Sequence, residues 1–235
     1  MIYLIPTTLS DDGPINIISN FNSKIIEKLR IFFVEEEKSA RQFIRKISAQ
    51  FPLQECQWYP LNEHTKPQEI KNYLALLASS DAGIISESGC PCVADPGTDL
   101  VLLAHQNNVE IIPLVGPSSI LLALMASGLN GQNFAFNGYL PKEREERVKK
   151  IKQLEKRSLA EGQTQIFMET PYRNQNIFED ILSCCVLATQ LCIAYDLTGA
   201  AQSIRTLSIS EWKKSKFVFS KKPALFLIGS KILNS

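Results

Sequence analysis

Residues 81–119 constrain the fold of this chain most strongly, because they alternate twice between apolar runs and loops of small residues. The apolar run Ala82–Ile85 leads into a loop, residues 86–97, that is rich in serine, glycine, cysteine and proline. A helical stretch, an apolar run at 110–115 and the loop Gly116-Pro117-Ser118-Ser119 follow. This order is typical of an open α/β sheet. Ligands of such sheets bind outside the carboxyl ends of the strands, so the two loops predict one binding crevice.

The region before this stretch also alternates between apolar runs and helical spacing. Strands are expected at 2–5 and 31–34, an extended segment at 53–61, and helices at 16–29, after Glu37 and at 67–79. Strands that alternate with helices favour a mostly parallel sheet.

The pattern changes in the second half of the chain. A helix is expected from Ser118 to residue 126, and a charged helix at 142–157. Strands are expected at 134–136 (followed by a turn at 137–141), 165–168, 190–196, 203–208 and 224–228, with helices near 177–182 and 210–214. Consecutive strands with short links favour an antiparallel or mixed sheet. The change predicts two α/β domains, 1–115 and 116–235.

The charge balance argues against a chain that binds nucleic acid through its overall charge. The 235 residues include 25 basic and 24 acidic side chains, a net charge of +1. A local patch could still bind RNA, and the only candidate is the lysine- and arginine-rich tract at 142–157. Helices that mix both signs of charge are more often solvated surfaces, so both interpretations stay open.

The sequence offers few metal ligands and no membrane segment. The spacings of the six cysteines match no common zinc site and only two histidines are present, which predicts free thiols and no metal. The first residues, Met1 to Pro6, lack the basic region of a signal peptide, and their apolar run is too short to span a membrane. A cytoplasmic protein without a membrane partner is therefore expected.

Several polar residues are candidates for chemistry. Glu35-Glu36-Glu37 follows a predicted strand and could hold a cation or a ribose hydroxyl, or merely precede a helix as solvated acids. His64 could be a general base or an ordinary loop histidine. The patterns G-x-x-x-x-G-K-[ST], G-x-G-x-x-G and G-x-S-x-G are absent. From the residues alone, the crevice binds a small molecule whose identity stays open.

The order of these motifs resembles the tetrapyrrole methylase superfamily. The stretch Ser86-Glu87-Ser88-Gly89-Cys90-Pro91-Cys92-Val93-Ala94-Asp95-Pro96-Gly97 is similar to the signature S-D-A-G-x-P-x-x-x-D-P-G. Within the superfamily the likeness is greatest to the branch that methylates a cytidine ribose 2′-hydroxyl in bacterial small-subunit ribosomal RNA, in a short form without the C-terminal extension. Further matches are Val115-Gly116-Pro117-Ser118-Ser119, Phe136-Asn137-Gly138-Tyr139-Leu140-Pro141, Phe167-Met168-Glu169-Thr170-Pro171-Tyr172-Arg173, Asp196-Leu197-Thr198 and Lys222-Pro223-Ala224.

The resemblance implies an S-adenosylmethionine-dependent methyltransferase. It implies two α/β domains with the cofactor in the cleft between them, a homodimer, and ribosomal RNA or the small ribosomal subunit as partner. The cofactor contacts it implies are Ser86, Glu87, Ser88, Val93, Ala94, Ser118, Ser119, Met168, Leu197 and Ala224. Candidate proton acceptors are Glu35, Glu36, His64 and Glu169.

The sequence departs from the ribosomal branch in two loops. Pro6-Thr7-Thr8-Leu9-Ser10 stands where the branch has P-T-P-[IL]-G-N-L, and Glu35-Glu36-Glu37-Lys38 where it has E-D-T-R. Because these loops are expected near the methyl acceptor, two alternatives stay open. One is methylation of a tetrapyrrole or corrinoid precursor, although the G-x-G-x-G-D loop of those enzymes is absent. The other is a protein that binds S-adenosylmethionine without catalysis.

Overall fold

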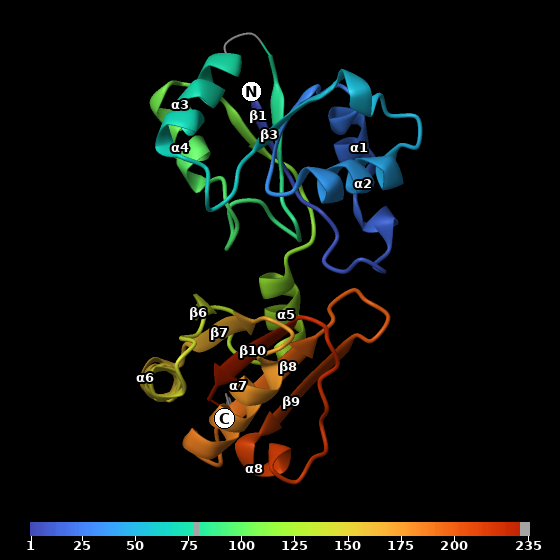
Figure 1. Cartoon of the computed structure of the whole chain (residues 1–235). Coiled ribbons are helices and arrows are strands. Elements are labelled where there is room, and N and C mark those ends of the chain that lie inside the picture. The colour runs from blue at the N-terminus through green and yellow to red at the C-terminus, as the bar shows by residue number, and fades with distance from the viewer. Residues whose placement is uncertain (78–79, 231–235) are drawn as a thin grey trace. The chain divides into compact units, whose positions relative to one another are not determined.

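A computed structural model describes residues 1–77 and 80–230 of the chain. Its internal contacts divide the chain into two compact units, Met1–Ser118 and Ser119–Ser235. Each unit contains one sheet with helices on both of its faces (Figure 1).

The first unit is built on a five-stranded sheet in which every strand pairing is parallel. The strand order is β3-β2-β4-β1-β5. The strands are β1 (Ile2–Ile5), β2 (Ile31–Val34), β3 (Gln57–Pro60), β4 (Ala82–Ile85) and β5 (Ile111–Pro113). Because β2 and β4 are covered on both faces, all of their residues are buried, which explains their uninterrupted apolar sequences.

Two pairs of helices cover opposite faces of this sheet (Figure 1). They are α1 (Asn20–Ile26) and α2 (Glu37–Ile47) on one face, and α3 (Pro67–Leu76) and α4 (Thr98–Gln106) on the other. Alternate residues of β2 separate two cores: Phe32 and Val34 pack with α1 and α2, whereas Ile31 and Phe33 pack with α3 and α4. The unit is therefore a three-layer α/β/α sandwich.

The second unit has a mixed sheet of order β6-β7-β10-β8-β9. Only β6 and β7 run parallel; the other neighbours are antiparallel. The strands are β6 (Phe134–Tyr139), β7 (Thr164–Glu169), β8 (Gln190–Tyr195), β9 (Ser203–Ser208) and β10 (Ala224–Gly229). The helices are α5 (Ser119–Ser127), α6 (Arg144–Glu161), α7 (Asn174–Cys184) and α8 (Ile209–Trp212).

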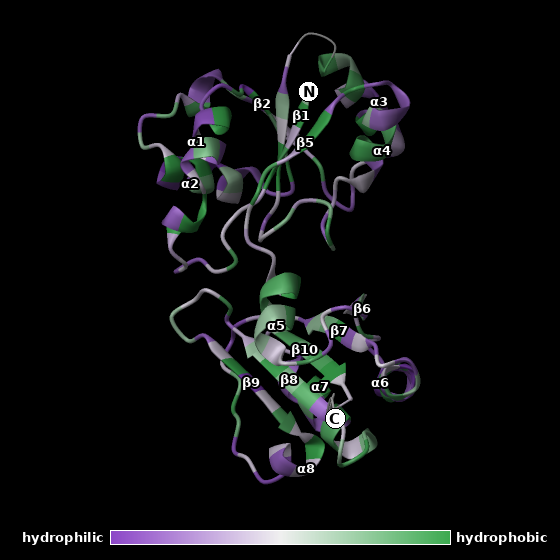
Figure 2. Cartoon of the chain, turned by 180° about the vertical axis from the view of Figure 1, so that it is seen from behind, coloured by the Kyte–Doolittle hydropathy of each residue, from purple (hydrophilic) through white to green (hydrophobic). Residues whose placement is uncertain are grey.

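The hydrophobic strands lie inside each unit, and α6 is the most hydrophilic of the long helices (Figure 2). On one face of the second sheet, Phe167 and Phe226 share a core with Ile151 of α6 and Ile177 of α7. The sequence predictions of a mostly parallel first sheet, a mixed second sheet and two α/β domains are confirmed.

Several predicted boundaries are wrong, each for a local reason. The helix expected at 16–29 is a 3₁₀ turn (Ile15–Ile17) followed by α1, because the Ser19 side chain accepts a hydrogen bond from Asn22 N and caps the helix start. A 3₁₀ turn (Leu53–Glu55) likewise precedes β3. The turn expected at 137–141 begins later, because β6 continues through a bulge at Gly138, whose φ is +63°. The last two residues of the helix expected at 67–79 lie outside the described residues.

The six cysteines are free thiols, as the sequence predicts. Across residues 1–77 and 80–230, no helix is long and apolar enough to cross a membrane.

Candidate functional site at the carboxyl edge of the first sheet

The strand order places a topological switch point between β1 and β4. From β1 the chain passes over β4 to reach β2, whereas from β4 it passes over β1 to reach β5. The helices that follow these strands, α1 and α4, pack on opposite faces of the sheet. Ligands of open α/β sheets bind outside the strands' carboxyl ends at such a point. The loop after β4, residues 86–97, starts there.

Hydrogen bonds tie this loop to the loop after β1. Thr7 N donates to Gly89 O at 2.9 Å, and the buried Thr7 and Ser86 hydroxyls lie 3.4 Å apart. Ser86 Oγ also donates to Gly89 O at 2.6 Å. Ser88 Oγ donates to Leu9 O at 3.4 Å. The buried Ser86 therefore organises the loop, whereas Glu87, Ser88, Val93 and Ala94 are exposed.

The backbone of this loop is strained at two residues that are not glycine. Cys92 and Ala94 have φ values of +64° and +59°. The left-handed region costs an L-residue about 1–2 kcal/mol. Such strain persists only where the surrounding structure imposes it, and it is concentrated at ligand-binding sites.

Two glycines permit close contacts between the loops. A Cβ on Gly89 would lie 2.9 Å from Leu9 Cδ2 and 3.3 Å from Pro117 O. A Cβ on Gly116 would lie 2.1 Å from Cγ and 2.4 Å from Cβ of Pro6, a rigid ring that cannot rotate away. The loops after β1, β4 and β5 therefore pack closely only because these positions lack side chains.

Replacing Gly116 with alanine is expected to destabilise the first unit by about 1–3 kcal/mol, the usual cost of overpacking. Chemical denaturation followed by circular dichroism would measure this loss. Gly131→Ala is the matched control, because within residues 1–77 and 80–230 no atom beyond its chain neighbours lies within 4 Å of the Cβ position there. Equal stability of the two variants would contradict the close packing of Gly116 on Pro6.

Three carboxylates lie near the carboxyl ends of β2 and β4. Burial raises the pKa of Asp95 to about 7, and repulsion from Glu35 and Glu87 adds to this shift. Burial also raises the pKa of Glu35, together with repulsion from Glu87 and Glu63. Asp95 Oδ2 is buried and has no hydrogen-bond partner among the described residues. Glu87 is held by Ser39, whose hydroxyl donates to it at 2.5 Å. This edge of the sheet is thus suited to a cation or to a hydrogen-bond donor.

Asp95→Asn is expected to raise stability at high pH. Because the folded-state pKa of Asp95 is raised, the folded chain binds a proton that the unfolded chain has lost, and wild-type stability falls as the pH rises from about 4 to 7. After discounting for partial exposure, the variant should gain roughly 1–2 kcal/mol over wild type at pH 8. At pH 4 this gain should vanish. Denaturation across pH 4–9 would test this, and a pH-independent difference would contradict it.

The second unit gathers other predicted contacts at one edge of its sheet. Ala224 pairs with Glu169 of β7 and with Tyr195 of β8. Met168 precedes Glu169, and the buried Leu197 follows β8. Met168, Leu197 and Ala224 therefore lie near one another within this unit. Ser119 begins α5, and Ser118 ends the first unit. Their contact with a cofactor stays a prediction.

The four candidate proton acceptors lie in different environments. Glu169 is buried and its Oε2 lies 3.0 Å from Arg173 Nη2, which gives it a structural ion pair. Glu36 caps α2 by accepting from Lys38 N. His64 is exposed beside Glu63. Only Glu35 combines exposure with a raised pKa at the carboxyl end of β2.

Sequence reasoning missed two residues of this site. Thr7 is buried against Ser86, although its own sequence looked like part of a polar loop. Asp95 lies in the motif at residues 86–97 but is not among the cofactor contacts that the resemblance implies. The Asp-Pro-Gly sequence of the motif was the available signal for Asp95, and the departure of the loop Pro6–Ser10 from the ribosomal branch was the signal for Thr7.

Comparison with known protein families identifies the class of enzyme. The chain belongs to the family "Tetrapyrrole (Corrin/Porphyrin) Methylases", whose model matches residues 23–212. It is therefore a methyltransferase, as the sequence predicts.

Three proteins of similar sequence share the same name. A Vibrio cholerae protein named "Ribosomal RNA small subunit methyltransferase I" is 27% identical, covering 90% of this chain and 69% of its own length. Escherichia coli O157:H7 and Thermotoga maritima proteins of that name are 25% and 28% identical. They cover 89% and 80% of this chain, and 70% and 80% of their own lengths.

Solved structures share the fold. The methyltransferase CobJ superposes with a TM-score of 0.62 at 16% identity, covering 97% of this chain and 92% of its own. The uroporphyrin-III-C-methyltransferase from Thermus thermophilus superposes with a TM-score of 0.55 at 16% identity, covering 97% and 91%.

Proposed function

We propose that this methyltransferase transfers a methyl group from S-adenosylmethionine to a ribose 2′-hydroxyl in small-subunit ribosomal RNA. The observation that carries this proposal is the match to relatives named as small-subunit ribosomal RNA methyltransferases, which extends over 90% of the chain for the Vibrio cholerae protein. The structures that share the fold support a tetrapyrrole acceptor only as members of the same family.

The residues of the first unit fit such a cofactor. S-adenosylmethionine carries positive charge and supplies a methyl group that its sulfonium centre has already activated. Carboxylates of Glu35, Glu87 and Asp95 make this edge favourable for a cation, and the unpartnered Asp95 Oδ2 can accept a hydrogen bond. The proposed contacts are Ser86, Glu87, Ser88, Val93 and Ala94 of the loop after β4, with Ser118, Ser119, Met168, Leu197 and Ala224.

Glu35 is the proposed proton acceptor. A ribose hydroxyl must lose its proton when its oxygen forms a bond to carbon, and a positioned carboxylate can take that proton. Burial and the neighbouring Glu87 raise the pKa of Glu35, which makes it a stronger base than an ordinary surface glutamate. Glu36 and Glu169 are less suited, because capping and an ion pair already engage their carboxylates.

Two measurements test the proposed function in sequence. Calorimetry tests whether the protein binds S-adenosylmethionine. The absence of binding heat at millimolar cofactor would refute S-adenosylmethionine as the methyl donor. Transfer of a tritiated methyl group to small ribosomal subunits that lack their methylations tests the acceptor. Label on a tetrapyrrole precursor but not on the subunits would replace RNA with the alternative acceptor. Light scattering would test the proposed homodimer.

A further inference from the structure

We infer that a row of three lysines on α6, Lys149, Lys152 and Lys156, contacts the phosphate backbone of the RNA substrate. The inference rests on the proposed function, because it names the surface that holds the proposed substrate. The three side chains are exposed. Their spacing of three and four residues places them on one side of the helix, over about 10 Å of its length.

Two acids of this mixed-sign helix are already engaged, one by a tertiary contact and one by a pair within the helix. Glu155 is buried, and its Oε1 accepts hydrogen bonds from Val186 N at 2.8 Å and from Thr189 Oγ1 at 2.5 Å. Glu161 pairs with Arg157, whose Nε lies 3.2 Å from Glu161 Oε2. Within residues 1–77 and 80–230, none of the ion pairs engages the three lysines. From Lys149 to Lys156 this side of the helix therefore presents a local row of cations, and the exposed Glu145 lies one turn before it.

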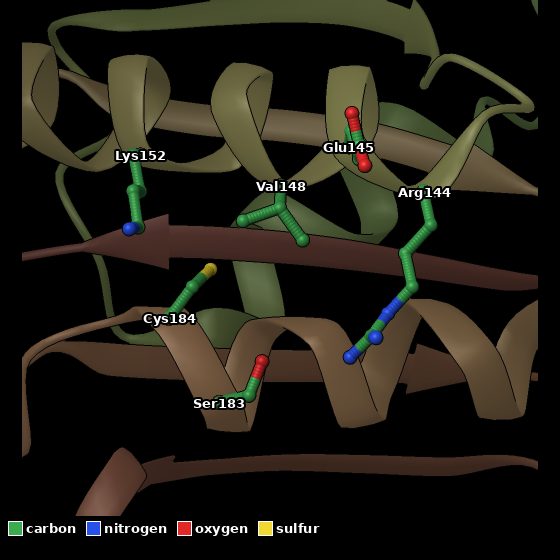
Figure 3. Close-up of a pocket in the computed structure, with 6 residues that line it drawn as sticks. All are labelled: Arg144, Glu145, Val148, Lys152, Ser183 and Cys184. Atoms are coloured by element: carbon green, nitrogen blue, oxygen red, sulfur yellow. The ribbon is translucent and has the colours of Figure 1, made fainter.

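A groove beside this row offers room for a backbone segment. It has a volume of about 450 Å³ and lies between α6 and α7, lined by Arg144, Glu145, Val148, Lys152, Ser183 and Cys184 (Figure 3). In this view Arg144 and Lys152 reach from α6 toward α7, while Ser183 and Cys184 reach back. Basic side chains thus stand at both ends of the groove, although Arg144 is paired with Asp180, and the lining includes one acid, Glu145. Hydroxyl and thiol groups lie between the two ends.

The chemistry of this surface favours RNA over a protein partner. Lysine is depleted in protein–protein interfaces, where aromatic residues and arginine are enriched. Lysine is a common phosphate ligand, and its charge can follow a flexible backbone without a fixed geometry. None of the six residues that line the groove is aromatic, so stacking of RNA bases on aromatic rings is not part of this contact.

The salt dependence of RNA binding tests the row. Each phosphate contact contributes about 0.7 to the slope of log K against log salt for a single strand. The variant K149Q/K152Q/K156Q should therefore bind a small-subunit ribosomal RNA fragment more weakly, with a slope reduced by about 2. The variant K213Q/K214Q/K216Q removes the same charge from the exposed segment that follows α8, and should keep the wild-type slope. An unchanged salt slope in the α6 variant would overturn the inference. The inference would also be overturned if the α6 variant bound intact subunits more weakly but bound the bare RNA as tightly as wild type does.

Cys184 provides a second measurement at the same place. Cys184 lines the groove and is half-buried, so a maleimide should be able to reach its thiol in the absence of RNA. RNA should slow the labelling of Cys184 in wild type but not in the α6 variant, as measured by peptide mass spectrometry. Equal labelling of wild type with and without bound RNA would overturn the inference.

These binding measurements need no methyl transfer, so the two proposals can fail separately. Wild type that binds and protects Cys184 without methylating RNA would refute the proposed function alone. If the wild type methylates RNA but the α6 variant keeps the wild-type salt slope, only the inference about the lysine row is refuted.

Discussion

Replacing Asp180 with alanine is expected to lower the free energy of unfolding of the second unit by about 3–5 kcal/mol. The Asp180 carboxylate is 3% exposed and pairs with Arg147, itself 7% exposed, at 2.7 Å. Arg147 also donates to Lys142 O at 2.5 Å, which holds the start of α6 in place. Without Asp180, the buried guanidinium would lose its counter-charge, and this accounts for the large expected effect.

Arg144 supplies the matched control for this prediction. Its Nε donates to the other carboxylate oxygen of Asp180 at 2.9 Å, but its side chain is 74% exposed. Arg144→Ala should therefore cost at most about 1 kcal/mol, as other exposed ion pairs do. Urea denaturation of both variants compares a buried and an exposed partner of one carboxylate. Similar losses in the two variants would contradict the assigned role of burial.

Replacing Glu35 with glutamine is expected to lower the turnover number for methyl transfer by about 100-fold or more. Glutamine keeps the size of the side chain but cannot accept the proton of the ribose hydroxyl. Because Glu35 is exposed, the stability of the protein should change little. The measurement is the single-turnover rate with saturating S-adenosylmethionine and undermethylated small subunits.

Glu36→Gln is the neighbouring control, because Glu36 caps α2 through Lys38 N and has no part in the proposed proton transfer. A second measurement follows from the raised pKa of Glu35. The wild-type rate should fall as the pH drops and Glu35 gains a proton, and this limb of the profile should disappear in Glu35→Gln. A rate within a few-fold of wild type would exclude Glu35 as the base.

Local patterns predicted the type of nearly every element. The short apolar runs of β2 and β4 are strands whose residues are all buried in the sheet, and β1 is a half-buried strand that ends directly before Pro6. Boundaries failed where a single side chain or glycine decided them. Because Ser19 caps the helix, α1 begins later than the apolar periodicity indicates. Strand β6 continues through a bulge at Gly138, where the sequence predicts a turn.

The family and the loop at residues 86–97 can be identified without a structure, because the motif of small residues is contiguous in the chain. The residues that surround this loop in space depend on tertiary contacts. The strand order brings Thr7 to Ser86, 79 residues away, and Gly116 to Pro6. Packing within the second unit also buries Glu155 and leaves Lys149, Lys152 and Lys156 exposed. Local periodicity does not encode which strands become neighbours or which charges are buried, because both depend on packing between distant segments.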